Sequence, residues 1–113
     1  MRYIISGRNI TVTEGLKEAI YDKLGKLEKY FTPDTEVIVT LSVEKQRQKI
    51  EVTVPVKGHT IRAEQSSDNM YVSIDLVEEI IVRQLRKYKT RIANQQNSRK
   101  NFQPAYLEME TDG

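Results

Sequence analysis

The sequence contains no cysteine and only one histidine among its 113 residues. Without cysteine the chain can form neither a disulfide nor a thiolate metal site, and nothing indicates an oxidising compartment. No apolar run approaches the roughly 18 residues that a membrane-spanning helix needs. Residues 1–7 include neither an extended apolar signal segment nor a cleavage motif. The sequence therefore predicts a cytoplasmic protein that makes no contact with a membrane.

Residues suited to catalysis are also scarce. His59 lies beside a turn glycine, and metal and nucleophilic sites need several converging groups, so we expect it to be neither a ligand nor a base. Asp75, Glu78 and Glu79 could bind magnesium in a small nuclease, but a solvated helix face is the favoured interpretation because no partner carboxylate lies elsewhere. There is no glycine-rich phosphate loop. We expect no enzyme, no catalytic residue, no metal, no cofactor and no small-molecule substrate.

The net charge of +2 conceals an uneven distribution of charge. Three of the 16 acidic residues and no basic residue fall in residues 101–113, so the first 100 residues hold 18 basic against 13 acidic side chains. Residues 83–100 contain seven basic residues and no acid. Such a block often marks a polyanion contact, although it can also be a solvated helix end.

Hydrophobic spacing predicts one strand followed by one helix in the first third of the chain. Residues 3–8 alternate as a short strand. Thr13 is placed to cap a helix that Pro33 ends. The apolar face of this helix recurs every three or four positions, at Leu16, Ile20, Leu24, Leu27 and Phe31.

Three period-2 segments and a long helix follow. Apolar residues alternate with polar ones over residues 36–44, 49–56 and 60–64, which predicts half-buried antiparallel strands. Asp68 can cap a helix running to about residue 95. Its apolar stripe consists of Met70, Ile74, Val77, Ile81, Leu85, Tyr88 and Ile92. Leu76 and Ile80 form a second apolar flank, which we interpret as contact with the first helix.

The predicted order is β-α-β-β-β-α, an α+β fold. A right-handed first crossover makes the first two strands parallel neighbours in a four-stranded mixed sheet, with both helices packed on one face. The part of this order that runs helix, three-strand meander, helix is also the layout of double-stranded-RNA-binding domains. We expect one domain over residues 1–95 and a flexible polar or acidic tail over residues 96–113.

Basic residues lie on the shoulders of both helical stripes. Lys23 and Lys26 share one shoulder of the first helix, and Arg83 and Lys87 lie beside the second apolar flank, with Arg86 further out. If the shoulders face each other, these charges form a shared ridge suited to an RNA backbone. The alternative is that they solvate amphipathic helices. Tyr30, Phe31, Tyr71 and Tyr88 could stack on bases, but their helical spacing favours core positions.

Three ordered motifs carry a resemblance to a known family. The first is Ile5-Ser6-Gly7-Arg8-Asn9-Ile10-Thr11-Val12-Thr13 followed by Leu16. The second is Lys23-Leu24-Gly25-Lys26-Leu27-Glu28-Lys29-Tyr30-Phe31. The third is Asp68-Asn69-Met70-Tyr71, then Ile74-Asp75-Leu76, then Arg83-Gln84-Leu85-Arg86-Lys87-Tyr88-Lys89. Over residues 1–95 the chain resembles the bacterial ribosome hibernation promoting factors, also described as ribosome-associated inhibitors or sigma-54 modulation proteins.

This resemblance implies a non-enzymatic domain that binds 16S rRNA in the tRNA and mRNA channel of the small ribosomal subunit and of the 70S ribosome. It implies inhibition of translation in idle, stressed or stationary-phase cells. Carried over by motif, the rRNA contacts are Lys23, Lys26, Arg83, Arg86, Lys87 and Lys89. The alternative is a structured-RNA-binding or sigma-54-modulating regulator that acts off the ribosome.

Two features depart from the family pattern. An asparagine is inserted in the usual acid-methionine-tyrosine triplet, so we expect Asp68 to cap its helix from one residue further upstream, and we assign Tyr71 and Asp75 to packing. Long family members also continue through an acidic linker into a C-terminal domain that pairs ribosomes. We expect the present chain to be a monomer, with ribosome pairing only where such a domain is attached.

Overall fold

The computed structural model describes residues 1–56 and 58–96, with the side chains of the last helix described as far as residue 87. Its elements in chain order are β1 (Arg2–Arg8), α1 (Glu14–Leu24), the 3-10 helix η1 (Gly25–Tyr30), β2 (Glu36–Glu44), β3 (Arg47–Val56), β4 (His59–Ser67) and α2 (Met70–Gln96). The predicted order and the α+β class are confirmed. The tail expected over residues 96–113 begins at the last residue of α2 and otherwise lies outside the described residues.

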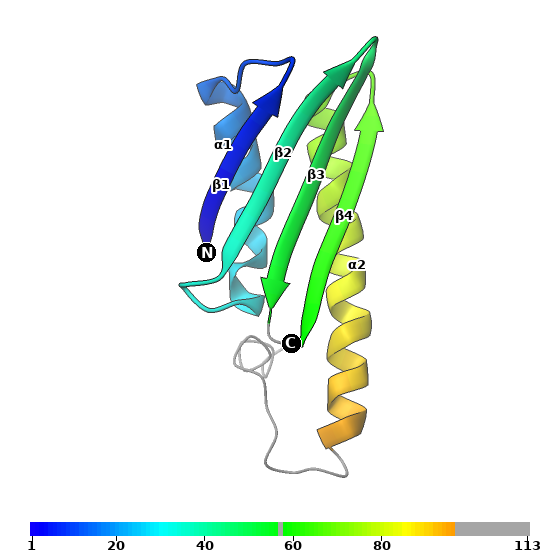
Figure 1. Cartoon of the computed structure of the whole chain (residues 1–113). Helices are drawn as coiled ribbons and strands as arrows, with labels where there is room; N and C mark the ends of the chain where they lie inside the picture. Colours follow the sequence, from blue (N-terminus) through cyan, green and yellow to red (C-terminus); the bar gives the residue numbers. More distant parts are fainter. Residues whose placement is uncertain (57, 97–113) are drawn as a thin grey trace.

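The four strands form one mixed sheet in the order β1-β2-β3-β4 (Figure 1). β1 and β2 are parallel, as the crossover through α1 predicted, and the two remaining pairs are antiparallel. Both helices cover the same face of the sheet (Figure 1). They run in the same direction, opposite to β1, so the N-termini of α1 and α2 lie at one end of the molecule and their C-terminal halves approach the other.

The core lies between the sheet and the two helices. Alternate residues of the strands point inward, and Val39, Leu41 and Ile50 are fully buried there. The helices supply Ile20 and Ile74, which are equally buried. Because each strand buries only one face, apolar residues recur at every second position along it, as they do in the sequence.

The first helix differs from its prediction near its C-terminus. Thr13 caps α1 as expected, because its Oγ1 accepts a hydrogen bond of 3.2 Å from the Leu16 amide. The α-helix ends at Leu24, however, and the chain continues as a 3-10 helix rather than as more α-helix. A 3-10 helix has three residues per turn, and the spacing of Leu24, Leu27 and Tyr30 fits that period with all three side chains buried.

The start of α2 corrects the second capping prediction. The residue that caps α2 is Asn69 and not Asp68: the Asn69 Oδ1 accepts a hydrogen bond of 2.9 Å from the Tyr71 amide. The first turn is also tied to the sheet, since the buried Ser73 hydroxyl donates to the Gln48 carbonyl at 2.7 Å and meets the Ser67 hydroxyl at 2.7 Å. These bonds fix where the helix begins, so that the backbone amides of its first turn lie within reach of the Asn69 side chain.

The capping assignment predicts different effects for two neighbouring side chains. Asn69→Ala should lower the free energy of unfolding by about 1 kcal/mol, because it leaves a helix amide without its acceptor. Asp68→Ala should change it by less than about 0.5 kcal/mol, as for an exposed side chain without such a bond. Urea denaturation of both variants measures the difference, and a larger loss for Asp68→Ala would contradict the assignment.

Candidate nucleic-acid interface

The outer surface of α2 changes charge along its length. Its first half carries the acids Asp75 and Glu79, and its described second half carries Arg83, Arg86 and Lys87 without an acid. These three basic side chains are exposed. The basic block of the sequence is therefore solvent-facing as far as it is described.

The shorter helical segment follows a similar trend. The first turns of α1 carry Glu14, Lys17 and Glu18, a net charge of −1, and η1 at the other end carries Lys26, Glu28 and Lys29, a net charge of +1. Because both helices run in one direction (Figure 1), the basic residues of the two segments gather toward the same end of the helix layer. The layer thus has an acidic end and a basic end, although the net charge of the chain is small.

Two contacts identify the side of α2 that faces α1. The Lys23 ammonium lies 2.9 Å from the Asp75 carboxylate, an ion pair between the helices. Near the N-termini, the Tyr71 hydroxyl lies against Gly15 of α1, where an added Cβ would be 3.0 Å from its oxygen. The Gly15 side of α1 is therefore closed by an aromatic ring from α2.

A third contact identifies the opposite side. The Gln84 amide nitrogen donates to the Arg62 carbonyl of β4 at 2.8 Å. An α-helix turns about 100° per residue, so Gln84 projects about 180° away from Asp75. One side of α2 faces α1, and the other faces the outer edge of β4.

This geometry separates the basic residues of the two helices. Arg83 and Lys87 project about 80° and 120° from Asp75 toward the Gln84 side, whereas Arg86 stays within about 20° of Asp75. Arg83 and Lys87 therefore face solvent and the β4 side. They do not face the lysines of α1 across a shared ridge.

The second apolar flank is corrected for the same reason. Leu76 and Ile80 are half-buried, and both project toward the side of α2 that carries Gln84. The interpretation that they contact the first helix is wrong. An apolar flank in a sequence indicates that this side of the helix is covered, but it does not indicate which neighbouring element covers it.

Lys23 occupies a different environment from the other predicted contacts. Its hydrogen bond to Asp75 raises the pKa of the Lys23 ammonium, and the negative charges of Asp75, Asp22 and Glu78 raise it further. Its side chain is 35% exposed. Lys23 is a firmly charged but already paired cation at the seam between α1 and α2.

The other predicted contacts have the following places. Within the described part of the chain, Lys26, Arg83 and Lys87 form no ion pair. The side chain of Lys89 lies outside the described residues. The basic end of the helix layer therefore presents at least three cations with no carboxylate bound to them.

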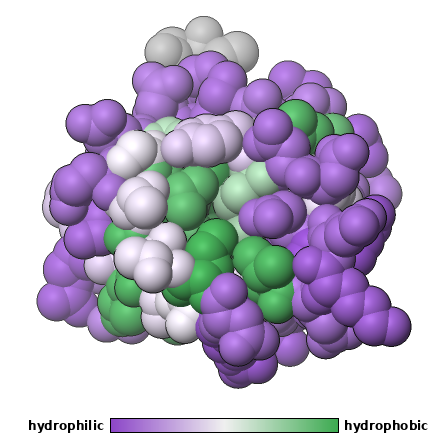
Figure 2. All heavy atoms as spheres, turned by 90° about the horizontal axis from the view of Figure 1, so that it is seen from above, coloured by the Kyte–Doolittle hydropathy of each residue, from purple (hydrophilic) through white to green (hydrophobic). Residues whose placement is uncertain are grey.

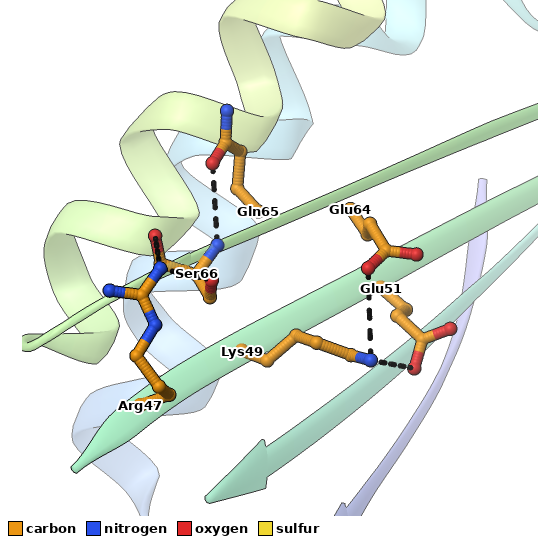
Figure 3. Close-up of polar contacts among 6 residues, drawn as sticks. All are labelled: Arg47, Lys49, Glu51, Glu64, Gln65 and Ser66. Atoms are coloured by element: carbon orange, nitrogen blue, oxygen red, sulfur yellow. Dashed lines mark hydrogen bonds and ion pairs between the residues drawn. The ribbon is translucent and has the colours of Figure 1, made fainter. Parts of the chain in front are cut away.

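The outer face of the sheet contrasts with the helix layer, because many of its cations are engaged. Figure 3 shows Lys49 between Glu51 and Glu64, at 3.6 and 3.7 Å, and Arg47 donating to the Ser66 hydroxyl at 2.7 Å. The same guanidinium reaches the Ser66 carbonyl at 3.4 Å. A separate pair joins Arg2 to Glu36 at 2.9 Å. Two cations of this face, Arg2 and Lys49, are therefore paired with carboxylates.

The aromatic residues divide into core and surface. Tyr30 and Phe31 are buried, as expected, but Tyr71 is 50% exposed, so the prediction that it is a core residue is wrong. Tyr71 follows Met70 by one position and so projects about 100° from the buried stripe. The side chain of Tyr88 lies outside the described residues.

One aromatic contact was not foreseen. The rings of Tyr3 in β1 and Tyr21 in α1 meet edge to face with centroids 4.9 Å apart. Burial raises the pKa of Tyr3 to about 12, with smaller contributions from Glu28 and Tyr21. The pair fixes α1 against the edge strand, and no periodic pattern reveals it because the partners belong to elements of different period.

A second unforeseen feature is an apolar hollow at the end where both helices begin. Figure 2 views this end and shows hydrophobic side chains gathered in its middle among hydrophilic ones. Ile10, Leu16, Met70 and Tyr71 contribute to its lining. No periodic pattern in the sequence predicts this hollow, because its lining comes from two loops, from β3 and from the first turns of α1 and α2.

Neither a metal centre nor a membrane span is found where the structure is described. Among residues 1–56 and 58–96, no cluster of three or more acidic or histidine side chains could hold a metal ion. Over the same residues, no helix combines the length and hydropathy needed to cross a bilayer.

The comparisons with known proteins agree with the fold. The profile of the family described as "Sigma 54 modulation protein / S30EA ribosomal protein" matches residues 3–93. The chain belongs to this family. The family resemblance inferred from the three motifs is thereby confirmed.

Two curated relatives in this family are named ribosome hibernation promotion factor. The protein of Lactococcus lactis subsp. cremoris (strain MG1363) is 45% identical over 95 residues, which cover 81% of this chain and 51% of the relative. The protein of Staphylococcus aureus (strain COL) is 40% identical over 102 residues, covering 88% and 54%. The chain thus spans about half the length of these relatives.

Solved structures show the same architecture. A ribosomal subunit interface protein from Coxiella burnetii superposes with a TM-score of 0.70 at 26% identity, covering 80% of this chain and 99% of that protein. The N-terminal domain of Protein Y from Thermus thermophilus superposes with a TM-score of 0.71 at 24% identity, covering 78% and 99%. The second likeness is one of fold alone. Together they confirm the mixed sheet covered by two helices.

Proposed function

We propose that this domain binds 16S rRNA in the tRNA and mRNA channel of the small ribosomal subunit, free or within the 70S ribosome, and so inhibits translation in idle or stressed cells. The observation that carries the proposal is the basic end of the helix layer, where Lys26, Arg83 and Lys87 have no carboxylate partner among the described residues. The names of the L. lactis and S. aureus relatives support a role in ribosome hibernation.

The chemistry of this end suits a folded RNA. Lysine and arginine side chains attract phosphates at long range without reading bases, and they release counterions when they bind. Lys26, Arg83, Arg86 and Lys87 would supply most of this attraction. Lys23 and Lys89 complete the set of six proposed rRNA contacts, with Lys23 already paired in the free protein.

The fold itself would supply the inhibition. A domain with a continuous buried core cannot share the volume that a tRNA occupies, so binding in the channel excludes tRNA and protects an idle ribosome. The proposal needs no catalytic group. We place the activity in the cytoplasm and in residues 1–95. We also propose that the domain acts as a monomer, because the outer sheet face is polar, carries internal ion pairs and is therefore poorly suited to self-association.

Competition with initiator tRNA tests the proposal directly. Saturating domain should displace initiator tRNA from purified small subunits and should protect 16S nucleotides of the decoding region from chemical modification. The displacement should be nearly complete, because two bodies cannot occupy one volume. A small subunit that holds the domain and initiator tRNA tightly at the same time would refute the proposed location.

A second candidate function is a regulator that binds structured RNA or a sigma-54 transcription factor away from the ribosome. The description of the family names sigma 54 modulation, and this supports the regulator as the second candidate. Retention on small subunits, compared with retention on an equal mass of unrelated structured RNA, distinguishes the two. Equal retention would favour the regulator.

A further inference from the structure

One ion pair joins α1 to α2 within the described residues, and it involves a proposed rRNA contact. The Lys23 ammonium is held 2.9 Å from the Asp75 carboxylate, while both side chains keep access to solvent, at 35% and 50% exposure. Lys26, Arg83 and Lys87 have no such restraint. Lys23 thus differs from these three cations in that its ammonium is held by a carboxylate.

The surroundings of Lys23 are acidic rather than basic. Asp22 precedes it on α1, and Glu78 lies one turn beyond Asp75 on α2, close enough for both carboxylates to act on the Lys23 charge. A phosphate that approaches this point meets one bound ammonium and three carboxylates. The seam between the helices therefore repels a phosphate unless the ammonium is presented to it directly.

We propose that Asp75 is a specificity-determining residue of the rRNA-binding surface, which holds the Lys23 ammonium at one position on the α1/α2 seam. Lys23 then reaches only a phosphate that the matching RNA surface places at that point. This inference rests on the proposed function, since it concerns which RNA surfaces the same layer accepts.

The chemistry of lysine explains why such a restraint matters. A free lysine is a point charge on a flexible four-carbon stem, and it contacts almost any phosphate within reach. An ammonium has three N–H donors, so one can remain on Asp75 while the others bind a well-placed phosphate. On a surface that does not match, Asp75 repels the phosphate instead. Discrimination between partners often depends on such a repulsive element.

The test compares two variants of α2 that lose the same charge. Asp75→Asn removes the partner of Lys23, and Glu79→Gln removes an exposed carboxylate four residues further along the same helix. Each is measured for binding to purified bacterial small subunits and to an unrelated structured RNA of similar length, over a series of salt concentrations. Lys23→Met, alone and combined with Asp75→Asn, completes a double-mutant cycle. Thermal melting confirms that every variant is folded.

Asp75→Asn should bind the unrelated RNA about 5-fold more tightly, with a salt slope steeper by about one, because a released lysine adds one phosphate contact. Its affinity for small subunits should change by less than about 2-fold. Preference for small subunits should therefore fall several-fold. Glu79→Gln should strengthen binding to both RNAs equally and leave the preference unchanged. In the Lys23→Met background, Asp75→Asn should behave like Glu79→Gln.

Equal effects of Asp75→Asn and Glu79→Gln on the preference would overturn the inference, as would a loss of preference that persists without Lys23. A lower melting temperature with an unchanged preference would also overturn it, because Asp75 would then be only a structural partner. Failure of the proposed function gives a different result, which is that the unaltered chain itself shows no preference for small subunits.

Discussion

Replacing Lys26, Arg83 and Lys87 together with alanine should weaken binding to small ribosomal subunits about 100-fold. Each side chain is exposed and lacks an ion-pair partner within the described residues, so each can form a charge-assisted bond to phosphate worth about 1 kcal/mol or more. Three such losses amount to about 3 kcal/mol. Filter binding or sedimentation with purified subunits measures the effect.

A matched variant controls for the loss of three positive charges. Arg8, Lys45 and Arg62 are exposed residues that belong to the sheet and its hairpin tip and not to the helix layer. Their replacement by alanine changes the net charge equally and should weaken binding about 10-fold at most. The fold of both variants should survive, because exposed substitutions usually cost within about 0.5 kcal/mol each. Equal losses in the two variants would mean that the helix layer is not the contact.

Binding should also fall steeply with salt. If Lys26, Arg83, Arg86 and Lys87 each displace counterions, the logarithm of the affinity should fall with the logarithm of the salt concentration with a slope of about −3. A four-fold rise in potassium chloride should then weaken binding about 60-fold. Titrations at a fixed magnesium concentration and at several potassium chloride concentrations give the slope.

The alanine variant makes the salt experiment specific to these residues. Removing three of the four cations should reduce the magnitude of the slope by about two. The control variant that lacks Arg8, Lys45 and Arg62 should leave the slope nearly unchanged. A flat dependence for the unaltered chain would contradict an electrostatic contact. An unchanged slope in the Lys26, Arg83 and Lys87 variant would place the phosphate contacts elsewhere.

The sequence predicted the layers of the fold because each element buries one face. Strand alternation put Val39 and Leu41 inside, and the helical period put Ile20 and Ile74 opposite them. The parallel pairing of β1 and β2 followed from the right-handed crossover. These features depend on period and handedness, which are properties that a sequence carries locally.

The side-to-side arrangement of the helices could not be predicted in the same way. The stripe of α2 shows which direction faces the sheet, but it does not distinguish the flank toward α1 from the flank toward β4. Leu76 and Ile80 were therefore assigned to the wrong neighbour. The contacts that decide the matter, Gln84 with β4 and Lys23 with Asp75, join residues far apart in the sequence.

The capping error has a similarly physical origin. Aspartate and asparagine are both good N-caps, and Asp68 and Asn69 are adjacent, so local preference cannot separate them. The hydrogen bonds of Ser73 to Gln48 and Ser67 fix the helix one residue later than expected. Of the predicted site, the exposed basic end of α2 was evident from composition. The pairing of Lys23 was not, because it depends on where α1 lies.

The outer edge of β4 has a consequence for the behaviour of the chain at high concentration. β4 is the last strand of the sheet, so every second residue along it turns its carbonyl away from β3 toward the open edge, and Arg62 and Ser66 are four residues apart on this strand. Such carbonyls are the template on which a foreign strand would pair. Here the Gln84 amide donates to the Arg62 carbonyl, and the Arg47 guanidinium donates to the Ser66 carbonyl. A chain adding itself as a fifth strand would have to displace both side chains, so this edge resists the sheet extension that begins aggregation.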